Sequence, residues 1–186
     1  LNISLPESYL IGLSILLFVI AILVGRQFFR TRKDEMRLIE LEKNVIGNSS
    51  NAGELYELGS VQLRKRLYPQ ATATLKKALK EIKEEPNEAK ALIENAIGFS
   101  LAAQNDFKSA IIHYKLAIKI KSDYPVALNN LAFAKKRMLA NDEAFSIYQN
   151  VLKIDPNNKT ALRESERISK SNKNNNLEKS INSKGF

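Results

Sequence analysis

The sequence predicts an all-α protein in which one apolar helix near the N-terminus is followed by an array of paired helices. Two observations indicate this class. Residues 9–25 form an uncharged apolar run. After residue 50, one pattern of small and aromatic residues occurs three times, and the step from the second copy to the third is the same at every matched position. Periods of roughly 20 to 50 residues are typical of helical repeat proteins, and the step from Gly98 to Ala132 falls in this range.

The composition is that of a folded protein, with 44% hydrophobic residues in a chain of 186. This length allows one modest domain and an anchor. The absence of cysteine excludes disulfides and thiolate metal sites. The net charge of +9 is spread along the chain, and the run Lys135, Lys136 and Arg137 is too short for a nucleic-acid surface. We therefore expect no nucleic-acid partner.

The apolar run Tyr9–Gly25 predicts a transmembrane anchor. It contains no charged residue, and most of its side chains are those of Leu, Ile, Val or Phe. At ~1.5 Å per residue it spans roughly 25 Å, close to a hydrocarbon core of about 30 Å. Tyr9 is expected at one interface, and Arg26, Phe28, Phe29 and Arg30 at the other. Residues 1–33 are thus interpreted as an anchor with a basic flank.

A cleaved signal peptide is the alternative for this run. It requires a basic segment before the apolar residues and a small-residue cleavage site after them. Here Glu7 precedes the run, while Arg26, Arg30, Arg32 and Lys33 follow it. This charge step favours an uncleaved anchor, and it predicts that the following residues lie on the cytoplasmic side or its organellar equivalent.

Residues 34–50 are expected to form a short amphipathic helix and a linker beside the membrane. Leu38, Leu41 and Val45 recur at helical spacing. The segment 47–53, GNSSNAG, is expected to end this helix as a flexible link.

The three matched copies lie in residues 51–168. Their equivalent positions are Leu58, Ile97 and Leu131; Gly59, Gly98 and Ala132; Ala71, Ala110 and Ala144; Leu75, Tyr114 and Tyr148; and Ala78, Ala117 and Val151. The step from the first copy to the second is longer than the step from the second to the third, which places an insertion within 84–90. This pattern indicates tetratricopeptide (TPR) repeats, helix–turn–helix units that stack into a right-handed superhelix. We predict repeats at about 52–90, 91–124 and 125–158.

Small residues at the start of each repeat explain how its two helices approach closely. Gly59, Gly98 and Ala132 are expected to face the second helix, and Tyr68 and Phe107 to plug the intervening turns, with Asn141 in the third turn. A capping helix is predicted over 157–168, facing the last repeat through Ala161, Leu162, Ser165 and Ile168. Residues 169–186 are rich in Asn, Ser and Lys and predict a disordered tail.

Several longer segments carry a closer resemblance. The sequence reads RQFFRTRKDE directly after the apolar run, then NAIGFSLAAQNDFKSAIIHYKLAIK and later DPNNKTALRESERI. Over roughly residues 3–168 the chain resembles the thylakoid-anchored TPR family of cyanobacteria and algal plastids associated with photosystem I assembly. The resemblance implies a single-pass thylakoid protein of photosynthesis with stromal or cytoplasmic repeats. The implied partners are photosystem I subunits or assembly intermediates.

No catalytic constellation is found in the sequence. His113 is the sole histidine and is expected to be an ordinary repeat residue, while Glu84, Glu85 and Glu88 are interpreted as a solvated loop. Gly-rich phosphate loops, GxSxG motifs and clusters with metal-ligand spacing do not occur. We therefore expect neither an enzyme nor a cofactor, metal or small-molecule substrate.

The first helices of stacked TPR repeats line a groove in which protein partners bind. The residues expected to face it are Tyr56, Ser60, Asn95, Phe99, Asn129, Asn130, Phe133 and Lys136. Their amides and aromatic rings suit an extended peptide, whereas the alternative is that they only complete a helix surface. TPR proteins that bind chaperone tails use a carboxylate clamp, whose matching positions here are Tyr56, Ser60, Ala96, Val126 and Asn130. These residues do not form a clamp. The sequence therefore predicts a membrane-anchored scaffold, with a general membrane-tethered TPR adaptor for another complex as the alternative.

Overall fold

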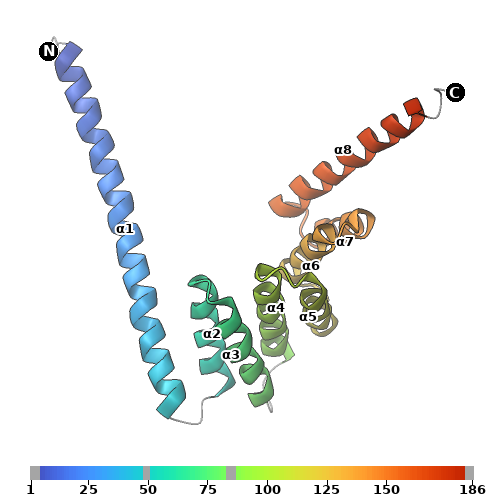
Figure 1. Cartoon of the computed structure of the whole chain (residues 1–186), viewed down its shortest axis with the longest axis horizontal. Helices are drawn as coiled ribbons and strands as arrows, with labels where there is room; N and C mark the ends of the chain where they lie inside the picture. The colour runs from blue at the N-terminus through green and yellow to red at the C-terminus, as the bar shows by residue number, and fades with distance from the viewer. Residues whose placement is uncertain (1–4, 48–50, 83–86, 183–186) are drawn as a thin grey trace. The chain divides into compact units, whose positions relative to one another are not determined.

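A computed structural model describes residues 5–47, 51–82 and 87–182, and the regular structure in these ranges is helical (Figure 1). The helices are α1 (Leu5–Gly47), α2 (Ala52–Arg64), α3 (Tyr68–Glu81), α4 (Asn87–Ala103), α5 (Phe107–Ile120), α6 (Pro125–Arg137), α7 (Asn141–Ile154) and α8 (Lys159–Asn182). They form two compact units, Leu1–Asn48 and Ser49–Phe186.

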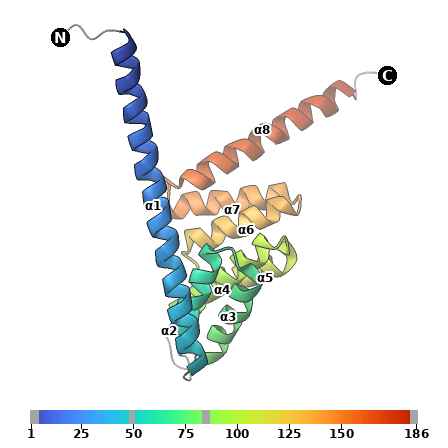
Figure 2. The same ribbon diagram turned by 60° about the vertical axis from the view of Figure 1, so that its left-hand side comes forward.

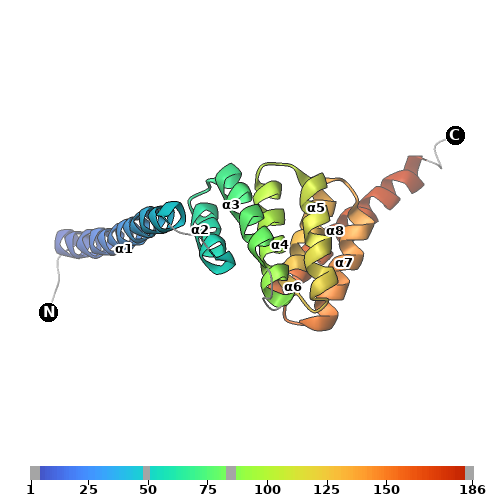
Figure 3. The same cartoon turned by 90° about the horizontal axis from the view of Figure 1, so that it is seen from below.

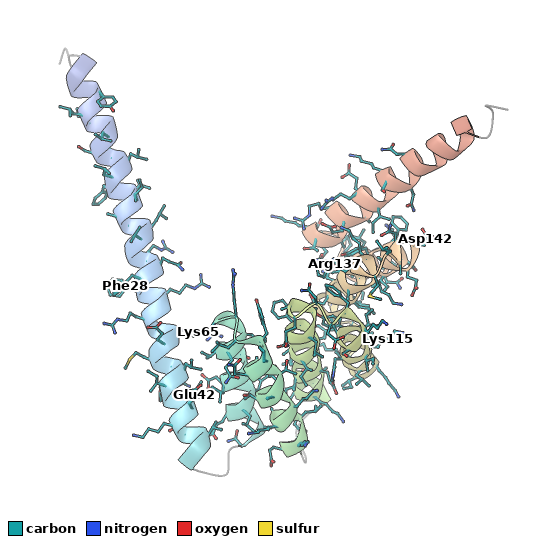
Figure 4. All side chains as sticks on the ribbon, viewed as in Figure 1. Phe28, Glu42, Lys65, Lys115, Arg137 and Asp142 are labelled. Carbon is teal, nitrogen blue, oxygen red and sulfur yellow. The ribbon has the colours of Figure 1, made fainter. Side chains whose placement is uncertain are left out.

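The first unit is a single helix of 43 residues. The apolar run and the amphipathic segment, expected as separate helices, are continuous in α1. Within the described residues, α1 has the length and apolar composition needed to cross a membrane, with a mean hydropathy of 2.4 in its most apolar stretch. Between Tyr9 and Val24 its apolar side chains are exposed, and Phe28 also projects from the helix, as Figure 4 shows, whereas Leu41 is buried. The Phe28 and Phe29 rings meet edge to face at 6.0 Å.

The second unit stacks three helical hairpins, α2/α3, α4/α5 and α6/α7, side by side (Figure 3). The matched second-helix positions are 0–1% exposed: Ala71, Leu75, Ala78, Ala110, Tyr114, Ala117, Ala144, Tyr148 and Val151. A Cβ atom added at Gly98 would lie 2.6 Å from Cε1 of Tyr114, and one at Gly59 would lie 2.7 Å from Cδ2 of Leu75. The predicted close contact between paired helices is therefore confirmed.

The turns inside the three repeats share one backbone geometry. Arg66, Asn105 and Leu139 occupy equivalent positions with φ of 60°, 65° and 63°. In each turn the amide of the next residue donates to a carbonyl near the end of the first helix, as Ala140 does to Lys135 at 3.0 Å. This is the left-handed helix end for which glycine is usually favoured. Asparagine tolerates it, whereas Leu139 adopts it at a cost in free energy.

The residues expected as turn plugs begin the second helices instead. Tyr68, Phe107 and Asn141 are the first residues of α3, α5 and α7. Phe107 is buried, while Tyr68 and Asn141 are half-buried.

The insertion in the first repeat lengthens the following helix. α4 begins at Asn87, so part of the extra segment forms an additional helical turn. Glu88, expected in a loop, lies in this turn and accepts a hydrogen bond of 2.8 Å from Lys121. An acidic residue in a first turn is stabilised by the helix dipole, which explains the difference. Glu84 and Glu85 lie outside the described residues.

The third repeat and α8 are stacked one above another in Figure 2. Ala161, Ser165 and Ile168 are buried against the repeat as predicted, but Leu162 is 48% exposed, so its assignment was wrong. The prediction of disorder after residue 168 was also wrong as far as Asn182, because α8 continues to that residue. Glu166 and Lys170 form an i,i+4 ion pair at 2.6 Å. A helix already nucleated by packing extends at low cost through such residues.

Candidate protein-binding groove

The groove is built by the first helices of the repeats together with α8. Hydrogen bonds link α4 to α6 and α6 to α8. Nδ2 of Asn130 donates to Oδ1 of Asn95 at 3.0 Å, joining α6 to α4. Nζ of Lys136 donates to Oε2 of Glu164 at 2.6 Å, joining α6 to α8. The predicted groove residues on α4 and α6 thus lie on a shared face with α8, and Tyr56 and Ser60 lie half-buried on α2.

An aromatic hollow of about 290 Å³ lies between α4 and α6. Phe99 and Phe133, which occupy equivalent positions of successive repeats, both line it and are each 45% exposed. The Phe133 ring meets the Phe107 ring edge to face at 6.3 Å, and the Arg137 guanidinium lies 4.8 Å from the Phe107 centroid. The hollow therefore presents two accessible aromatic faces beside a cation, a combination that favours protein recognition.

A second hollow, of about 490 Å³, lies between α6 and α8. Phe133 and Asn130 line both hollows, so the two are adjacent along the groove. Its other described lining residues are Val126, Asn129, Lys136, Tyr148, Thr160, Arg163, Glu164 and Arg167. This end of the groove is charged, in contrast to the aromatic hollow.

The asparagines of the groove make more hydrogen bonds within the chain than the sequence suggests. Asn95 accepts from Asn130 and donates to the Tyr124 hydroxyl at 3.4 Å. Asn129 donates to Oδ1 of Asn158 at 3.0 Å, and Asn158 in turn accepts from the Ala161 amide at the start of α8. These amides hold neighbouring repeats in register. Only part of their hydrogen-bonding capacity is left for a partner protein. Oδ1 of Asn129 has no hydrogen-bond partner in the described structure, but it is buried and therefore not accessible to a ligand in the groove.

Glu164 is the electrostatic centre of the charged end. Besides Lys136, it receives Nε of Arg163 at 3.1 Å and Nη1 of Arg167 at 3.4 Å. The hydrogen bond from Lys136, aided by both arginines, lowers the pKa of Glu164 below its ordinary value despite partial burial. The carboxylate is therefore ionised at neutral pH, and three cations surround one anion. Burial raises the pKa of the nearby Tyr148 to about 12, so its hydroxyl stays neutral.

Sequence reasoning missed Arg163, Glu164 and Arg167. A usable signal existed, because Glu164 and Arg167 stand at i,i+3 spacing on a helix already predicted to close the array. Their meeting with Lys136 depends on the packing of α8, which the repeat pattern did not specify. The basic run at the end of α6 is likewise engaged within the chain, since Lys135 pairs with Glu143 at 2.6 Å.

His113 has a partner that the sequence did not indicate. Its Nδ1 atom lies 2.7 Å from Oε2 of the buried Glu94, across the α4/α5 hairpin. Within the described residues, no group of three or more His, Cys, Asp and Glu side chains is arranged to hold a metal ion. The His113–Glu94 pair joins two helices of one repeat.

Comparisons with known proteins place this geometry in context. A search of family models gives no match. The chain is 33% identical over 160 residues to the chloroplastic tetratricopeptide repeat domain-containing protein PYG7 of Arabidopsis thaliana, covering 86% of this chain and 53% of that protein's length. It is 29% identical to the uncharacterized protein ycf37 of Guillardia theta, covering 84% of this chain and 88% of that protein.

Solved structures share the fold. MamA aligns with a TM-score of 0.66 and 19% identity over 73% of this chain and 76% of its own. The first TPR domain of Spaghetti (RPAP3), bound to an HSP90 peptide, aligns with a TM-score of 0.59 and 22% identity over 64% of this chain and 94% of its own.

The stacked hairpins and the groove define a tetratricopeptide-repeat protein. More specifically, its sequence is similar to the chloroplastic TPR protein PYG7 and to the ycf37 proteins, and it spans about half the length of PYG7.

Proposed function

We propose that this chain is a protein-binding scaffold without turnover of its own. The observation that carries the proposal is the groove of α4, α6 and α8, where Phe99 and Phe133 are exposed beside cations and partly occupied amides. Large aromatic faces offer contact area at low entropic cost, and amides orient a bound backbone. An extended segment of a partner protein is the ligand that such a surface fits best.

We further propose that α1 anchors the scaffold in the thylakoid membrane, with the repeats on the stromal or cytoplasmic side. Its exposed apolar residues and the basic residues that follow support this assignment. The proposed division of the chain is an anchor over residues 1–33, a juxtamembrane segment over 34–50, and the repeats with their cap over 51–168. A cleaved signal sequence has the same apolar composition. N-terminal sequencing of the mature protein distinguishes the two, because an anchor retains residues 9–25.

The proposed process is the assembly or stability of photosystem I. Support comes from the family resemblance and from the relative whose name places it in the chloroplast. The alternative is a general membrane-tethered adaptor for another complex.

Quantitative pull-down of the full chain from membranes solubilised in mild detergent tests the proposal. We expect photosystem I subunits or assembly intermediates to be enriched over a control with Asn95, Phe99, Asn129 and Phe133 replaced by Ala. Groove-dependent enrichment of a different complex would favour the alternative. Equal recovery by both chains would exclude the groove as the binding surface.

A further inference from the structure

The two ends of the groove differ in charge, and this difference bears on what the scaffold binds. The aromatic hollow contains Phe99, Phe133 and the single cation Arg137. The hollow between α6 and α8 adds Lys136, Arg163 and Arg167 against the single carboxylate of Glu164. Positive charge is thus concentrated beside an exposed aromatic ring.

The arginines are held in place but remain accessible. Arg163 and Arg167 each contact Glu164 through one guanidinium nitrogen, and their side chains are 68% and 67% exposed, respectively. Glu164, only 9% exposed, serves as an internal anchor for them. The remaining guanidinium nitrogens are available to accessible carboxylates, which arginine binds in a bidentate geometry.

The cations of this cluster do not stand at the carboxylate-clamp positions of chaperone-binding TPR domains, although two of those positions line the same hollow. At those positions stand Tyr56, Ser60, Ala96, Val126 and Asn130, which carry no charge. The cations come instead from the last turn of α6 and from α8. An acidic ligand would therefore contact the junction of the third repeat and the closing helix.

From this charge complementarity we infer that the groove binds an extended protein segment in which one or two acidic residues stand next to a large apolar residue. The acidic residues contact Arg163 and Arg167, and the apolar residue covers Phe133, which borders both hollows. This inference rests on the proposed scaffold function and specifies the partner's chemistry.

The test uses the full chain in lipid nanodiscs and a display library of random dodecapeptides. Peptides retained by the native chain but lost by the Asn95, Phe99, Asn129 and Phe133→Ala variant are groove ligands. We expect these ligands to be enriched in Asp or Glu adjacent to an aromatic or branched apolar residue. Groove ligands without this enrichment would overturn the inference and leave the scaffold function standing. A library that yields no groove ligands would overturn both.

A charge reversal then tests the contact directly. The Arg163→Glu/Arg167→Glu variant should bind the selected acidic peptides at least about tenfold more weakly, which corresponds to about 1.4 kcal/mol. The same variant should bind more tightly than the native chain to versions of these peptides with Lys in place of Asp and Glu. A matched control, Lys76→Glu/Lys153→Glu, makes the same change in net charge at exposed sites on α3 and α7 and should leave affinity unchanged. Equal loss in the control, or unchanged binding in the reversal variant, would refute the arginine contacts.

Discussion

Both units of the chain expose large apolar side chains, but the surroundings of these side chains differ. In α1, the residues from Tyr9 to Val24 are exposed around the helix, and charged groups do not interrupt them. In the groove, Phe99 and Phe133 are exposed among amides, a lysine and arginines. Apolar area alone gives affinity for any apolar medium, because the hydrophobic effect is non-directional. Polar groups around an aromatic ring add orientation, and therefore selectivity.

The largest expected effect concerns α1. Its central Leu, Ile, Val and Phe residues, at roughly −0.3 to −0.6 kcal/mol each, together favour insertion by several kcal/mol. The full chain should therefore stay in membranes through high salt and alkaline carbonate, whereas a chain that begins at Asp34 should be soluble. Fractionation and immunoblotting measure this, and release of the intact chain by carbonate would contradict the anchor.

The sidedness of the anchor is tested on the same membranes. Protease added from the cytoplasmic or stromal side should digest the repeats, because Arg26 to Lys33 predict that orientation. Protected repeats would mean the opposite topology.

Removal of the polar and aromatic contacts of the groove should weaken partner binding while the repeats stay folded. Replacing Asn95, Phe99, Asn129 and Phe133 together by Ala should weaken binding of a native partner by more than about a hundredfold, since aromatic hot spots cost about 2 kcal/mol or more each. Helicity should stay nearly intact, although the lost Asn129–Asn158 and Asn95–Asn130 bonds will lower the melting temperature slightly.

Substitutions at Lys76, Lys119 and Gln149, on the second helices, serve as the control and should change affinity little. If they abolished binding while the groove variant bound normally, the binding face would lie on the second helices.

Beneath the groove, the packing between paired helices predicts a smaller effect that is confined to stability. Gly98→Leu should cost roughly 1 to 3 kcal/mol or more, because even a Cβ there would lie 2.6 Å from Tyr114. Ala73→Leu, at an exposed site on α3, is the matched control. Thermal unfolding followed by circular dichroism measures both, and an unchanged melting temperature for Gly98→Leu would contradict the described contact.

The smallest expected effect is a gain in stability. Leu139→Gly should stabilise the repeats by about 1 kcal/mol, because Leu139 has a φ of 63° and is 86% exposed. Asn105→Gly, at the equivalent turn, should gain less, since asparagine tolerates this conformation. Chemical denaturation compares the two. A loss of stability in Leu139→Gly would show that its side chain contributes more than its backbone costs.

The contacts made inside each repeat follow from the order of amino acids alone. Gly98 and Tyr114 contact each other from the paired helices of one repeat. Gly59 and Leu75, separated by the same number of residues, make the equivalent contact in the repeat before it. A short turn leaves two such helices few ways to pack, so small and large residues at fixed positions specify the contact. The pattern that predicts these helices also predicts which of their faces is buried.

The contacts between repeats and the chemistry of the groove depend instead on tertiary packing. Asn130 on α6 meets Asn95 on α4, and Lys136 on α6 meets Glu164 on α8. Such meetings depend on how far each hairpin is rotated against the next, which the internal period does not encode. The extension of α8 had the same origin, since docking of Ala161 and Ile168 nucleates a helix whose later residues show little apolar periodicity. The packing of α8 against α6 thus brings Lys136, Arg163 and Arg167 together in one basic site.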